Sequence, residues 1–159
     1  MVNVLDKVQP KNKTQLKSLI EYTFNHNIYD LNFIDTSEIT DMSNLFMNCE
    51  YDIDVSNWDV SNVTNTAGMF FYCKNLDCDL SNWDVSNVTN TSGMFYFCEN
   101  FDCDLSRWNV SNVKYMYLMF YNCKKFNSDM SNWNVTKAKF TLNMFDGCDK
   151  MTIPNWYKK

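Results

Sequence analysis

The fold is decided by residues 83–98, which read WDVSNVTNTSGMFYFC. Three of these positions recur at intervals of 25 residues, first Trp, then Phe, then Cys. The recurring residues are Trp58, Trp83, Trp108 and Trp133; Phe70, Phe95, Phe120 and Phe145; and Cys73, Cys98, Cys123 and Cys148. A fixed period of about 20 to 50 residues is typical of stacked repeats, because each unit buries its apolar face only against its neighbours. The chain is therefore expected to be a repeat solenoid.

Apolar spacing within one unit changes from a period of two to a period of three or four. Trp83 and Val85 flank Asp84, which predicts a short strand with one buried face. Val88, Thr91 and the residues that follow predict a loop and one short helical turn. We therefore expect a parallel β-solenoid of about five coils, in which each coil is a strand, a loop and a tight helical turn.

The two ends of the chain differ from the repeats. Leu16, Leu19, Ile20 and Phe24 keep helical spacing, with Thr14 as the expected N-cap, which predicts an N-terminal α-helical cap over residues 1–33. The 25-residue repeats are expected over residues 34–150, and a C-terminal closing turn over residues 151–159. All three parts form one domain, since 159 residues is an ordinary domain length.

Composition excludes several classes of protein. The net charge of -5 gives no basic footprint for phosphate, so direct binding of nucleic acid is not expected. No apolar stretch is long enough for a membrane span, and the start lacks the pattern of a signal peptide. As given, the chain is expected in the cytoplasm or inside a host cell, and at the cell surface if a leader was removed.

The motif at residues 58–65 and 83–90, WDVSNVTN, is followed by Gly-Met-Phe and a Cys. This order resembles the tandem repeat of BspA-like leucine-rich-repeat surface proteins. The opening at residues 10–20 is similar to the cap helix of such arrays. The resemblance implies a leucine-rich-repeat-like solenoid with a role in adhesion or protein interaction, without naming a ligand.

Catalytic chemistry finds little support in the sequence. His26 is the only histidine, and the three glycines make no phosphate loop, so neither an enzyme nor a cofactor is expected. The Cys column supplies one thiol per coil and no Cys-x-x-Cys pair, so no metal site is expected. Two alternatives stay open: a disulfide between Cys78 and Cys103, and calcium rather than backbone N–H groups on the stacked Asp columns.

Three features are candidates for binding a protein partner of unknown identity. The first is the face beside the Trp and Val columns, which is the usual binding surface of leucine-rich-repeat proteins. The second is a ridge of aromatic residues that cannot all point inward. The third is a charge gradient, since residues 34–57 carry six acidic and no basic residues, whereas 133–159 carry two acidic and five basic. The residues expected to contact a partner are Asp59, Asp84, Arg107, Asn109, Asn134, Tyr96, Tyr121, Tyr115 and Tyr117.

The expected function is that of a non-enzymatic protein-binding repeat module, of the host-interaction or adhesin type. One alternative is a self-assembling structural scaffold, which the charge gradient would favour through head-to-tail contacts between copies. Another is an acidic nucleic-acid mimic that inhibits a host enzyme through Asp54, Asp79 and Asp104.

Overall fold

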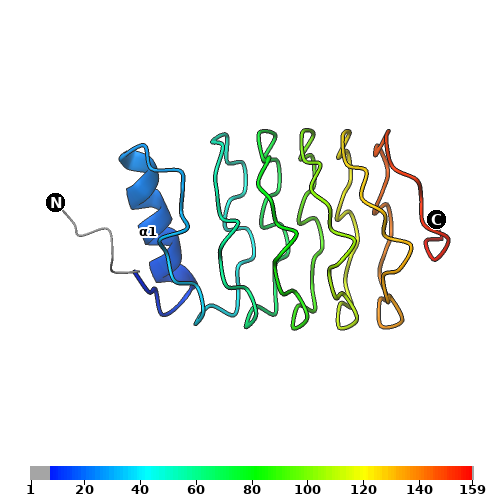
Figure 1. Ribbon diagram of the computed structural model, residues 1–159, viewed down its shortest axis with the longest axis horizontal. Coiled ribbons are helices and arrows are strands. Elements are labelled where there is room, and N and C mark those ends of the chain that lie inside the picture. Colours follow the sequence, from blue (N-terminus) through cyan, green and yellow to red (C-terminus); the bar gives the residue numbers. More distant parts are fainter. Residues whose placement is uncertain (1–7, 159) are drawn as a thin grey trace.

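A computed structural model describes residues 8–158 of the chain. The parts of the expected end caps that fall on residues 1–7 and 159 lie outside the described residues. Helix α1, Lys13–Asn25, lies at one end, and turns of the chain are stacked beside it along one axis (Figure 1). We call these turns coils 1 to 5 and give them residues 34–57, 58–82, 83–107, 108–132 and 133–158.

The β-solenoid expected from the sequence is wrong. Within residues 8–158, α1 is the one helix, and extended pairing is confined to six isolated parallel bridges, with no strand. The stretch from Trp58 to Val63 is a series of turns, because Val63 N–H donates to Val60 C=O and the Asp59 carboxylate accepts Ser61 N–H. Backbone groups satisfied locally in this way cannot form a ladder with a neighbouring strand. Alternation of apolar and polar residues here reflects turns that point Asp59 outward.

The coils are joined instead along a segment that we call the wall. Walls 1 to 5 are residues 41–48, 65–72, 90–97, 115–122 and 140–147. In wall 3, the N–H groups of Thr91, Gly93, Phe95 and Phe97 each donate to a carbonyl of wall 4 at 2.8–2.9 Å. The N–H groups between them donate within the same wall, either to a carbonyl three residues back or, for Ser92, to the side chain of Asn90. Successive N–H groups therefore alternate between two roles: one set joins neighbouring coils, and the other set closes turns within the wall.

Each wall contains two residues in the left-handed region of backbone space. In wall 2 these are Gly68 and Tyr72, with φ of 62° and 60°. Their counterparts include Leu118 and Phe97, both with φ of 58°, although side chains with a Cβ disfavour this region. Left-handed residues interrupt a right-handed helix, so the helical turn expected after Val88 is replaced by a chain of tight turns.

The core is a set of columns that run through the stack. Rings of the Phe column lie nearly parallel, with Phe95 centred 5.7 Å from Phe70 and 5.5 Å from Phe120. Each Trp of the repeat donates its indole N–H to a backbone carbonyl 27 or 28 residues earlier in the chain, as Trp83 does to Val55 at 3.2 Å. These buried contacts register one coil on the next, because an indole N–H buried without an acceptor would be costly.

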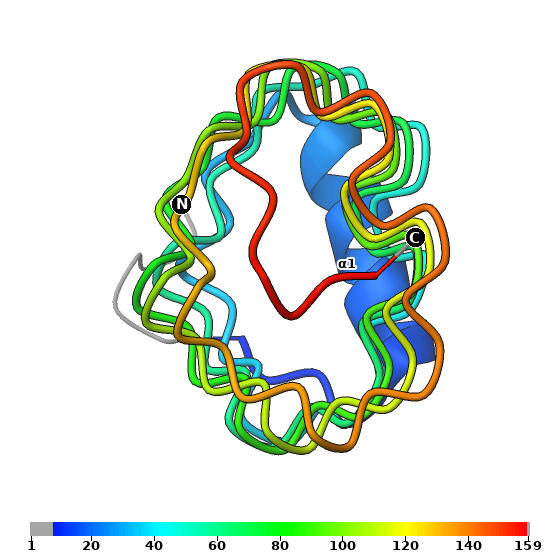
Figure 2. The ribbon, with the colours of Figure 1, turned by 90° about the vertical axis from the view of Figure 1, so that its right-hand side faces the viewer.

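Helix α1 covers the open end of coil 1. Its N-cap is Asn12 rather than the expected Thr14, and the Asn12 carboxamide accepts the N–H of Gln15 at 3.0 Å. Leu16 and Ile20 are buried against the stack. At the opposite end the last residues cross the opening of the ring (Figure 2). There Trp156 occupies the next place in the Trp column and donates to Met130 C=O at 2.8 Å.

Candidate protein-binding surface

The four Asp and Asn residues expected to contact a partner beside the Trp column are exposed, but they are also used in turns. Asp59 and Asp84 each accept the N–H of the Ser two residues later at 3.0 Å. Asn109 accepts the N–H of Ser111, and Asn134 accepts the N–H of Thr136, both at 3.2 Å. One side-chain oxygen of each is therefore committed to folding, as in other Asx turns. Bonds from the Ser86 side chain and backbone also lower the pKa of Asp84.

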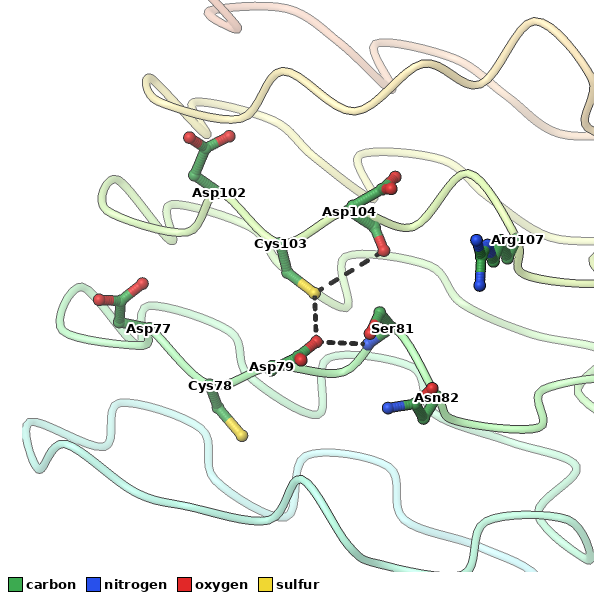
Figure 3. Close-up of a pocket in the computed structure, with 9 residues that line it drawn as sticks. All are labelled: Asp77, Cys78, Asp79, Ser81, Asn82, Asp102, Cys103, Asp104 and Arg107. Carbon is green, nitrogen blue, oxygen red and sulfur yellow. Dashed lines mark hydrogen bonds between the residues drawn. The ribbon is translucent and has the colours of Figure 1, made fainter.

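Arg107 lies beside a groove lined by stacked carboxylates. The groove has a volume of about 470 Å³ and lies on coils 2 and 3 (Figure 3). Asp79 accepts Ser81 N–H at 2.9 Å, and bonds from Ser81 lower the pKa of Asp79. The Asp column therefore holds turns, which is the alternative to calcium that the sequence left open. No cluster of His, Cys, Asp and Glu suited to a metal ion occurs among residues 8–158.

All seven cysteines are thiols. Cys78 and Cys103 accept backbone N–H groups of the preceding coil, and the Cys103 thiol donates to Asp79 at 3.5 Å. Ser128 makes the same pair of contacts one coil later. Burial raises the pKa of Cys78 to about 12 and that of Cys103 to about 11. This column links coils through hydrogen bonds, not through a disulfide.

The aromatic ridge is a half-buried stack. Tyr96 lies between Phe71, 4.4 Å away, and Tyr121, 5.1 Å away, with the rings close to parallel. Tyr72 and Phe97 form a second stack at 4.7 Å. Because Tyr96 and Tyr121 bury much of their ring surface against each other, the ridge mainly covers the outside of the walls and leaves little side-chain surface free for a partner.

The other two predicted tyrosines form a more exposed surface with two residues of wall 5. We define the apolar patch as Tyr115, Tyr117, Phe140 and Leu142, whose exposed fractions are 40%, 46%, 51% and 68%. Tyr115 and Phe140 are stacked with ring centroids 5.2 Å apart and are joined by a parallel bridge. The structure thus brings Tyr115 and Tyr117 together with side chains from the next coil.

Earlier coils are polar or small at the patch positions. The same columns hold Asn65 and Ala67 in wall 2, and Asn90 and Ser92 in wall 3. Leu142 is not among the contacts predicted from the sequence, because that prediction considered aromatic side chains and not aliphatic ones. A comparison of the Ala67 column would have found it, since the column changes from small to large side chains along the chain.

Charge distinguishes this surface from the groove near Arg107. Lys114 and Lys139, each beside an aromatic residue of the patch, are exposed. Asp77, Asp79 and the Asp residues of the next coil surround the groove instead. The apolar patch therefore has basic neighbours, whereas the groove is acidic. Among the described residues, no helix is long and apolar enough to cross a membrane.

Comparison with known proteins gives a family but no characterised relative. A family model described as "Mycoplasma protein of unknown function, DUF285" matches residues 14–113 and again residues 40–156. No curated protein and no solved structure matches the chain.

Proposed function

The chain belongs to the DUF285 family, and we propose that it is a non-enzymatic module that binds another protein through the apolar patch. The patch carries the proposal because four large apolar side chains, from two adjacent coils, leave much of their surface in water. Exposed aromatic residues that cluster in this way are typical anchors of protein interfaces.

The neighbouring residues support the same proposal. Tyr115 and Phe140 are held rigid by their stacking and by the bridge between their backbones, so little conformational entropy would be lost on binding. Lys114 and Lys139 would add electrostatic steering of an acidic partner.

The resemblance to BspA-like surface repeats supports a finer version of the proposal. In that version the partner is a host or cell-surface protein and the module acts as an adhesin. The site would then lie outside the cell if a leader is removed, and the cytoplasm or a host cell is the alternative location.

The proposal is tested by photo-crosslinking in lysate of the cells that encode the chain. A photoreactive phenylalanine replaces Phe140 in one protein and Tyr22, an exposed residue of α1, in a matched control. A protein crosslinked at position 140 but not at position 22 supports the proposal, and its affinity for the purified chain is then measured.

Two substitutions settle whether the patch carries the affinity. The double variant Tyr117→Ser, Leu142→Asn should weaken binding by at least about tenfold, because loss of an anchor side chain commonly costs more than about 1 kcal/mol. Tyr22→Ser should leave the affinity unchanged. Equal affinities for the wild type and the double variant would contradict the proposal.

A further inference from the structure

The two ends of the stack of walls expose opposite halves of the same hydrogen-bond pattern. Every backbone hydrogen bond between neighbouring walls runs from an N–H group of one wall to a C=O group of the next, at 2.7–3.0 Å in all four pairs of walls. The polarity of this pattern leaves donors at the end of wall 5 and acceptors at the start of wall 1.

Wall 5 ends in a row of unused donors. The N–H groups of Thr141, Asn143, Phe145 and Gly147 occupy the places whose counterparts in wall 4 donate to wall 5. Within residues 8–158 none of the four has an acceptor. The C-terminal segment covers the core rather than this edge, since Trp156 stacks on Trp133 at 6.5 Å. We call these four N–H groups the donor edge.

Wall 1 begins with the matching row of acceptors. The carbonyls of Asp41, Ser43, Leu45 and Met47 occupy the places that accept from a preceding wall in every later coil, and no donor to them occurs in the described part of the chain. Helix α1 lies over this acceptor edge. Lys13 donates to the Ser43 hydroxyl at 2.6 Å, and Phe24 lies 6.5 Å from Phe46.

An acceptor edge of this repeat matches the donor edge in both hydrogen-bond polarity and spacing. Two donor edges cannot pair with each other, because both present N–H groups and both lie in coil 5, which is rich in lysine. An acceptor edge offers four carbonyls at the required spacing, as each internal contact between walls shows. Coil 1, which carries the acceptor edge, has six acidic and no basic residues and so complements coil 5 in charge.

We propose that the donor edge is a binding site for the uncovered acceptor edge of another chain of this repeat, and that α1 prevents the protein from joining its own copies end to end. The inference goes beyond the proposed function, because it concerns the end of the stack rather than the apolar patch. Capped ends are what keep repeat arrays from continuing into neighbours.

The test uses a variant with α1 released. Leu16→Asp with Ile20→Asp places two charges where α1 is buried on coil 1. Sedimentation velocity should show a monomer for the wild type and oligomers that grow with concentration for the variant. Excess wild type should then convert these oligomers to a species of twice the 18.9 kDa chain mass, because it supplies a donor edge but no free acceptor edge.

Two further variants separate the edge from the patch. Thr141→Pro removes one donor of the edge without removing a hydrogen bond from the described chain, so this variant should no longer shorten the oligomers. Tyr115→Ser with Tyr117→Ser replaces the two patch residues of wall 4 and leaves every residue and N–H group of wall 5 in place, so this variant should shorten the oligomers as the wild type does.

A folded α1 variant that remains a monomer would overturn the proposal, as would oligomers that excess wild type does not shorten. Circular dichroism and tryptophan fluorescence establish whether the double variant is folded. Should it be unfolded, the milder Ile20→Ala takes its place and the same two outcomes decide.

Discussion

Replacing Phe95 by Ala should destabilise the protein far more than the same replacement at Phe140. Phe95 is fully buried and contacts the rings of Phe70, Phe120 and Phe101 at centroid distances of 5.7, 5.5 and 4.3 Å. Deleting a buried phenyl group costs about 3–5 kcal/mol, because transfer energy is lost and a cavity remains. We expect a loss of about 4 kcal/mol in the free energy of unfolding.

Phe140 provides the matched control. It is half exposed and stacks on a single ring, that of Tyr115, so Phe140→Ala should cost less than about 1 kcal/mol. Urea denaturation followed by tryptophan fluorescence measures both variants. At about 2–4 °C per kcal/mol for a domain of this size, Phe95→Ala should lower the melting temperature by about 8–16 °C. A cost for Phe95→Ala within about 1 kcal/mol of the control would refute the continuous aromatic column.

Three other predictions concern the turns and the thiols. Gly147→Ala should lower the free energy of unfolding more than Gly93→Ala. A Cβ is strained by the positive φ at both positions, but at Gly147 the new Cβ would also lie only 3.2 Å from the Cα atom of Asn122. Equal losses in the two variants would contradict this packing. The folded-state pKa of Asp79 is lowered, so its stabilisation is present above the unfolded pKa of about 4 and is lost as the pH falls through the folded value. Urea denaturation as a function of pH should therefore show stability falling below about pH 4, less steeply in Asp79→Asn; a pH-independent stability would contradict the Asx turns. Burial raises the pKa of all seven thiols, and Cys103 is the one that is partly exposed. Iodoacetamide should therefore modify Cys103 first, as measured by mass spectrometry, and earlier modification of Cys98 would contradict the buried column.

The repeat period identifies the buried columns from the sequence. Trp83, Phe95 and Cys98 belong to buried columns, because residues one period apart occupy the same place in successive coils. The alternation of apolar and polar residues predicted a strand at Trp83 to Val85, and that prediction was wrong. The Asp84 carboxylate accepts the Ser86 N–H and so forms a turn. The spacing of apolar residues alone does not distinguish a turn that exposes one residue from a strand.

The candidate site was partly accessible from the sequence. Tyr115 and Tyr117 stand out because earlier coils carry small or polar residues in their columns. Whether Tyr96 is free could not be predicted, because its exposure depends on stacking against Phe71 in the preceding coil. The donor edge has no sequence signature, since it consists of backbone groups whose partners are set by the alternation of turns.

Amide hydrogen exchange, resolved by residue, tests most directly the claim that alternate N–H groups join the walls and leave a free edge at wall 5. Wall 4 and wall 5 provide the comparison within one molecule. The N–H groups of Met116, Leu118, Phe120 and Asn122 should be strongly protected, because each donates to wall 5 at 2.8–3.0 Å. Those of the donor edge, Thr141, Asn143, Phe145 and Gly147, should exchange much faster. Similar protection of the two sets would contradict both the stacking pattern and the free edge.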